Sequence, residues 1–82
     1  MMTRINVSMS SGNANLNTIS GGRDGDVIIL STVNVGGTLT VKDGTGNIEC
    51  GTDFAMVTVL DRMTLMYDGS ISKWVQLARS TN

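Results

Sequence analysis

Glycine is the residue that most constrains how this chain can fold, because it supplies nearly all of the turn geometry. The sequence contains ten glycines and no proline. Glycine readily adopts the positive φ angles that tight turns require. Most of the glycines fall between short segments rich in Val, Ile, Thr and Leu, at positions 21–22, 25, 36–37, 44, 46, 51 and 69. Such closely spaced segments are typical of β-strands, so the sequence predicts an all-β fold.

The apolar pattern also predicts where the strands lie and how some of them are joined. We expect strands over residues 1–9, 16–19, 27–30, 38–41, 48–50, 54–60, 63–67 and 71–77. The pair 54–60 and 63–67 is expected to form a hairpin around Asp61 and Arg62, and Asp68–Gly69 should turn the chain into the last strand. The fold class is therefore a compact antiparallel sandwich or barrel-like module of short strands with glycine-rich turns.

The size of the chain makes self-association a natural source of stability. Eighty-two residues form one domain, and a core of this size supplies little surplus free energy of folding. Cys50 is the only cysteine and histidine is absent, so neither an intrachain disulfide nor an ordinary zinc site is expected. Yet 40% of the residues are hydrophobic, and segments such as 27–30 and 54–57 are apolar on both faces. We expect a second copy of the chain to cover the apolar side chains that its own core cannot bury, with a tightly packed monomer as the alternative.

Charge and hydropathy argue against two classes of partner. The net charge is −1 and the six basic residues are scattered, which disfavours a nucleic-acid surface. No apolar run approaches the ~20 residues that span a membrane, so no membrane partner is expected. Residues 1–11 lack the continuous apolar segment of a secretory signal, and we expect synthesis in a cytoplasm.

The side chains offer little for catalysis. Without histidine, neither a Ser-His-Asp nor a Cys-His arrangement can form. Cys50 has Ile48 and Phe54 as close neighbours, which favours a buried thiol over a nucleophile. Most of the carboxylates lie in glycine-containing turns, where Asp accepts hydrogen bonds from nearby backbone. We expect neither an enzyme nor a cofactor.

Two segments partly match calcium-binding loops. Residues 21–28 approximate one nonapeptide of a calcium-binding β-roll, but Asp24 stands where that repeat has glycine. Residues 43–54 begin like an EF-hand loop, but Ile48 replaces its glycine and Phe54 its bidentate glutamate. We therefore expect no metal.

Four short motifs in the last two thirds of the chain occur in a characteristic order. They are GGTLTVKDGTGNI at 36–48, TDF at 52–54, DRMTLMYDG at 61–69 and KWVQLARS at 73–80. Over residues 25–82 this set resembles a module of tailed bacteriophages, found at the ends of tail fibres and spikes and in small virion proteins. The resemblance implies a trimeric, β-rich module with a structural rather than catalytic role. Gln76 and Ala78 depart from the acidic and serine residues of the motif, so no binding role is carried over to single residues.

A freestanding copy of this module fits a capsid decoration (cement) protein better than a fibre tip, which follows a long shaft. We expect a homotrimer that binds the major capsid protein or another virion protein, in a virion assembled in the bacterial cytoplasm. Residues 1–17 would form an N-terminal arm with the first strand and a connector, and residues 18–82 the β-module. The residues expected to dock on the partner are Ile5, Val7 and Met9. Those expected to pack between copies are Trp74, Met56 and Met66.

Other functions stay open at this point. A trimerisation or receptor-binding tip of a tail fibre or tailspike is the main alternative. A sugar-binding module would need an exposed Trp74, which could equally be a core residue. A small enzyme would need carboxylates that converge between protomers.

Overall fold

The computed structural model describes residues 2–8, 12–33 and 37–81, and all of the regular structure in them is β-strand. The prediction of an all-β fold is therefore confirmed. The strands are β1 (Met2–Ser8), β2 (Ala14–Leu16), β3 (Val27–Val33), β4 (Leu39–Val41), β5 (Ile48–Glu49), β6 (Phe54–Met56), β7 (Arg62–Asp68) and β8 (Lys73–Ser80).

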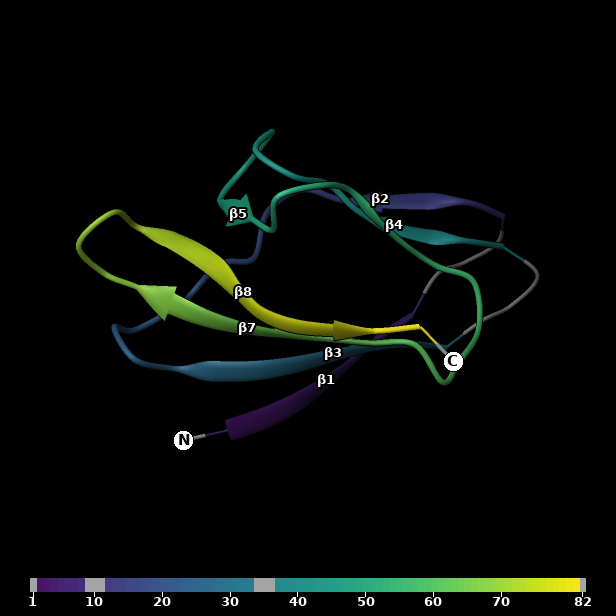
Figure 1. Cartoon of the computed structure of the whole chain (residues 1–82), viewed down its shortest axis with the longest axis horizontal. Helices are drawn as coiled ribbons and strands as arrows, with labels where there is room; N and C mark the ends of the chain where they lie inside the picture. Colours follow the sequence, from purple (N-terminus) through teal and green to yellow (C-terminus); the bar gives the residue numbers. More distant parts are fainter. Residues whose placement is uncertain (1, 9–11, 34–36, 82) are drawn as a thin grey trace.

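The strands form two open sheets that face each other (Figure 1). The larger sheet has the order β1-β3-β7-β8-β5, and the smaller has the order β2-β4-β6. Neither sheet closes on itself, so the sandwich expectation is correct and the barrel expectation is not.

The sheets are mixed rather than purely antiparallel, which corrects the sequence-based expectation. β3, β7 and β8 pair antiparallel, whereas β1 pairs parallel with β3, β2 with β4, and β5 with β8. The reason is that successive strands from β1 to β7 lie in opposite sheets. The chain leaves β1, passes through β2 in the other sheet, and returns to β3 in the same direction.

The core lies between the two sheets and follows the period-two alternation of strands. In β3, Ile28 and Leu30 point inward, and in β7 Met63 and Leu65 do so. Eleven buried residues make up the core: Ile28, Leu30, Leu39, Val41, Ile48, Cys50, Phe54, Met56, Met63, Leu65 and Trp74. The residues that alternate with these along β3 and β7 lie on the opposite face of the larger sheet, which the smaller sheet does not cover.

The expected hairpin of residues 54–60 and 63–67 is wrong. β6 ends at Met56 and pairs with β4, whereas β7 pairs with β3 and β8 in the other sheet. Residues 57–61 therefore cross from one sheet to the other. Asp61 closes this crossing, because its buried Oδ2 accepts the N–H groups of Val57 (2.9 Å) and Thr58 (3.3 Å).

The turn predicted at Asp68–Gly69 joins β7 to β8, as expected. Asp68 Oδ1 accepts hydrogen bonds from the Ser70 backbone N–H and hydroxyl, at 3.0 and 2.6 Å. Ser72 has a φ of 56°, so the chain enters β8 through a left-handed residue. The last strand accordingly begins at Lys73 rather than at Ile71.

The N-terminal strand belongs to the same two-layered unit as the rest of the chain. All seven residues of β1 pair in register with β3, from Met2 opposite Val27 to Ser8 opposite Val33. β2 pairs in the same way with β4. The first strand of the expected N-terminal arm thus forms one edge of the larger sheet (Figure 1).

Candidate interaction surfaces

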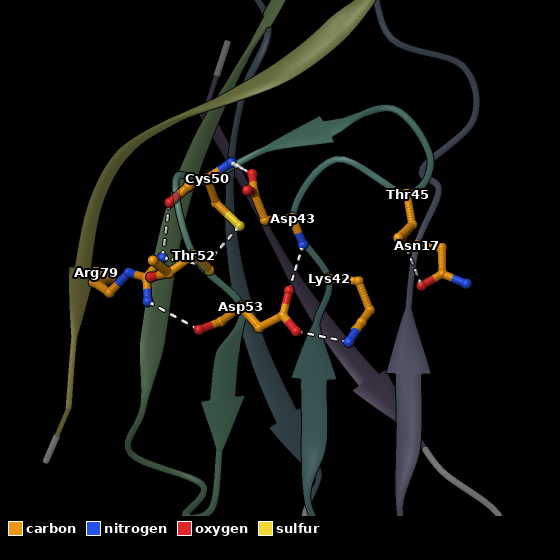
Figure 2. A network of polar contacts seen from close by, with 8 residues as sticks. All are labelled: Asn17, Lys42, Asp43, Thr45, Cys50, Thr52, Asp53 and Arg79. Atoms are coloured by element: carbon orange, nitrogen blue, oxygen red, sulfur yellow. Dashed lines mark hydrogen bonds and ion pairs between the residues drawn. The ribbon is translucent and has the colours of Figure 1, made fainter.

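A network of polar contacts closes the loops on either side of β5 (Figure 2). Asp43 Oδ1 accepts the N–H groups of Cys50 (2.9 Å) and Gly51 (3.0 Å). Asp53 in turn accepts the N–H of Asp43 at 2.8 Å and pairs with Lys42 Nζ at 2.6 Å. These bonds to Asp53 hold the pKa of its carboxyl below the ordinary value, first through the backbone N–H of Asp43 and then through Lys42. The carboxylates here bind backbone, as expected for turns.

Arg79 completes this network from the end of β8. Its Nη2 donates to the carbonyl oxygens of Cys50 (2.9 Å) and Thr52 (2.8 Å), and its Nε donates to Gln76 Oε1 (2.7 Å). The guanidinium also lies 4.8 Å from the centre of the Phe54 ring. Arg79 therefore fixes the 50–53 loop to the larger sheet, and its donors are directed at the chain itself (Figure 2).

Cys50 lies inside this network as a buried thiol. Its Sγ is 3.2 Å from the Thr52 carbonyl oxygen, and burial raises its pKa. A raised pKa keeps the sulfur protonated and disfavours attack by the thiolate. Within residues 2–8, 12–33 and 37–81 we find no cavity of ligand size and no group of three side chains suited to a metal. The exposed surfaces of the two sheets and their loops are the candidate interaction sites.

The sequence-predicted packing residues divide between the core and the surface. Trp74 is 3% exposed, and its Nε1 donates to the Ile19 carbonyl at 3.1 Å. Met56 is fully buried. Both side chains pack inside their own chain, which leaves Met66 as the member of this set that lies on a face open to another copy.

Met66 belongs to an apolar row across the outer face of the larger sheet. The pairing places Val27 opposite Met66, and Met66 opposite Val75. Ile29 lies next to this row on the same face of β3, and all four side chains are half-buried. This row, which we call the outer row (Val27, Ile29, Met66 and Val75), has no covering layer among the described residues. The sequence indicated it through the strands that are apolar on both faces.

A second apolar surface is the loop that crosses between the sheets. Val57, Val59 and Leu60 are each 50–59% exposed. The loop is nevertheless fixed, because Asp61 accepts hydrogen bonds from the Val57 N–H and the Thr58 hydroxyl. The loop lies at the end of the larger sheet where β7 begins and β8 ends (Figure 1). Sequence reasoning missed this surface, because residues 57–60 were expected to continue a strand.

The expected docking strand is partly open to solvent. Ile5 is 37% exposed, whereas Val7 is half-buried and packs against the core. Met9 lies outside the described residues. Among the described residues, β1 has a hydrogen-bonded neighbour in the sheet on one side only, so its other edge is open.

No protein-family model matches the chain, and no curated protein is similar enough to count as a relative. Nor does the described part of the chain contain a helix long and apolar enough to cross a membrane.

Proposed function

We propose that the chain is a non-enzymatic structural protein of a bacteriophage virion, most consistent with a trimeric capsid decoration protein. The motif resemblance over residues 25–82 supplies the virion context and the trimer. The single structural observation that supports it best is the outer row, because no second layer among the described residues covers these four apolar side chains.

The proposed mechanism is burial of this apolar surface. Each bound copy removes apolar area from water, which favours the assembled shell over its separated subunits. Because the decoration protein binds only the assembled shell, it stabilises that state by mass action. No bond is made or broken, and the chain needs no pocket for this work.

The second candidate is the tip of a tail fibre or tailspike. The exposed loop with Val57, Val59 and Leu60 favours it, because loops at one end of a rigid sandwich are suited to receptor contact. The two candidates differ in where the protein sits on the particle.

The location can be measured on particles of the phage that encodes the chain. Antibody labelling in electron microscopy should place the protein on the head, and particles that lack it should release their DNA at a lower temperature. Purified protein should restore the heat stability. Labelling at the tail tip, with reduced adsorption and an unchanged head, would support the fibre tip instead. Absence from purified particles would refute both.

The outer row can be tested with a matched pair of variants. Met66→Lys together with Val75→Lys should abolish restoration of head stability, because two charges replace the apolar face. Ile71→Lys is the control, since Ile71 is 52% exposed in the turn that precedes β8. Light scattering on the wild type should give three times 8.7 kDa, or a multiple of that mass where trimers associate. If the double variant restores stability as well as the control does, the outer row is not the contact surface.

A further inference from the structure

The open edge of β1 has properties that single it out among the strand edges of this fold. Its seven residues pair continuously with β3 and contain no bulge. Apart from half-buried Val7, the residues from Thr3 to Ser8 are exposed. A strand at the edge of a sheet that does not pair with another chain usually carries proline, lysine or a bulge. β1 has none of these, and Arg4 is its only charged residue.

We propose that β1 pairs antiparallel with β1 of a second copy, about a two-fold axis beside Ile5. In this register Arg4 lies opposite Asn6 of the second copy, Thr3 opposite its Val7, and Ile5 opposite its Ile5. The two five-stranded sheets then continue as one sheet across the axis. Such a contact uses the same strand on both copies, which is the common arrangement in soluble dimers.

The faces of β1 support this pairing. Thr3 and Ile5 pair with Ile28 and Leu30, which are buried, so the odd-numbered residues of β1 lie on the core face. Residues directly opposite each other in an antiparallel pair point to the same face. The proposed register places Thr3, Ile5 and Val7 against one another, and all three are β-branched. Cross-strand pairs of β-branched residues stabilise sheets, and Ile5 would lose its exposure.

The register follows from charge and strand length. A shift by one residue would place core-face side chains opposite outer-face ones. A shift by two in one direction would place Arg4 opposite Arg4, and like charges directly opposite are destabilising. A shift by two in the other direction would leave residues 4–8 paired and lose the contacts of Met2 and Thr3. The register centred on Ile5 is the one that pairs the whole strand without a like-charge contact.

The backbone groups also match in this register. In a parallel pair, alternate residues direct both N–H and C=O to the neighbour, and the residues between direct theirs outward. The proposed register pairs even with even and odd with odd positions. The backbone N–H and C=O groups that point outward on one copy therefore meet those that point outward on the other. This holds whether the even or the odd positions of β1 point outward.

This proposal rests on β1 alone and does not depend on the proposed function. A two-fold contact joins two single chains, or one chain of a trimer to a chain of another. The wild type should therefore have the mass of two or six chains at micromolar concentration, with dissociation on dilution. A mass of 8.7 kDa throughout, or of three chains, would overturn the β1 pairing. Three chains would at the same time agree with the trimer of the proposed function.

Charge changes at positions 4 and 6 test the register itself. Asn6→Arg places arginine opposite Arg4 twice across the axis and should raise the dissociation constant about tenfold. Asn6→Glu should lower it several-fold, and loss of folding cannot mimic this gain. The double variant Arg4→Glu, Asn6→Arg exchanges the two charges, so it should associate as tightly as Asn6→Glu. Arg23→Glu, at an exposed position outside β1, is the control that should change nothing. If the dissociation constant is insensitive to the charge at position 6, the contact lies elsewhere.

Discussion

The indole of Trp74 meets the ring of Tyr67 edge to face, with centroids 5.1 Å apart and planes inclined at 66°. Edge-to-face pairs add stabilisation beyond the area that they bury. Gly22 lies directly against both rings. A Cβ on this residue would overlap Tyr67 Cδ1 and would be 2.9 Å from Trp74 Cζ2.

Gly22→Ala should therefore force the two rings apart. We expect the free energy of unfolding to fall by about 1–3 kcal/mol, as for overpacked cores. Near-ultraviolet circular dichroism should show a changed aromatic signal, because the ring pair is displaced. Ser20→Ala, at an exposed position of the same segment, is the control. An unchanged aromatic spectrum in Gly22→Ala would contradict the close contact.

Asp61→Ala should loosen the crossing between the two sheets. It removes the acceptor for the N–H groups of Val57 and Thr58 and for the Thr58 hydroxyl. Because Asp61 is fully buried, we expect a loss of about 2–3 kcal/mol in urea unfolding. Asp61→Asn keeps one acceptor oxygen and should lose less. Equal losses in the two variants would mean that shape, not hydrogen bonding, holds this loop.

Arg79→Lys should show that the geometry of the guanidinium, rather than its charge, holds the 50–53 loop. Lysine cannot donate in a fork to the carbonyls of Cys50 and Thr52. We expect the free energy of unfolding to fall by about 1–2 kcal/mol. Each kcal/mol corresponds to a fall of roughly 4–8 °C in Tm for a domain of this size. Arg23→Lys should leave Tm unchanged. A Tm of Arg79→Lys equal to that of the wild type would show that charge alone suffices.

The Cys50 thiol should react slowly in the folded protein. Burial raises its pKa, so little thiolate is present near neutral pH. Labelling by a disulfide reagent at pH 7 should be at least tenfold slower in the native state than in denaturant. Equal rates would indicate that the thiol is accessible.

Acid should remove the contribution of Asp53 to stability. Its folded pKa lies below its unfolded value, which is about 3.9 for Asp, because the charged form is bound by Asp43 N–H and Lys42. Such a group stabilises the folded state above the unfolded pKa and loses that effect as the pH falls through the folded pKa. The stability difference between wild type and Asp53→Asn should be constant above about pH 5 and should shrink below about pH 4. A difference that stays constant down to pH 3 would contradict this assignment.

Local patterns in the sequence predicted the positions of most strands and which of their faces are buried. A strand was expected over residues 38–41, and Leu39 and Val41, two positions apart in it, are both buried. The pattern could not predict the partner of each strand, because alternation shows which face of a strand is buried but not which strand lies beside it. The parallel pair β1–β3 and the separation of β6 from β7 depend on contacts far apart in the chain.

For the same reason, the sequence indicated some of the exposed surfaces and missed others. Met66 was named from its residue type, and its strand places it on the outer face. Trp74 was assigned between copies as well as to the core, since composition alone cannot distinguish the two. Its partner Ile19 is 55 positions away, and no local signal indicates that contact. The exposed loop was missed because Val57 and Val59 have the residue types of a strand.

The parallel pairing of β1 with β3 also bears on how fast the chain folds. Asn6 and Ser31 are bonded across 25 positions, and β3 itself is completed by β7, much later in the chain. β1 therefore has no neighbour until β3, 25 positions later in the chain, is in place. Closing such long loops costs entropy before any contact forms, and β-proteins dominated by such pairs fold in milliseconds to seconds. During that interval the unpaired β1 is available to other molecules, so refolding at high concentration should aggregate more than refolding at low concentration.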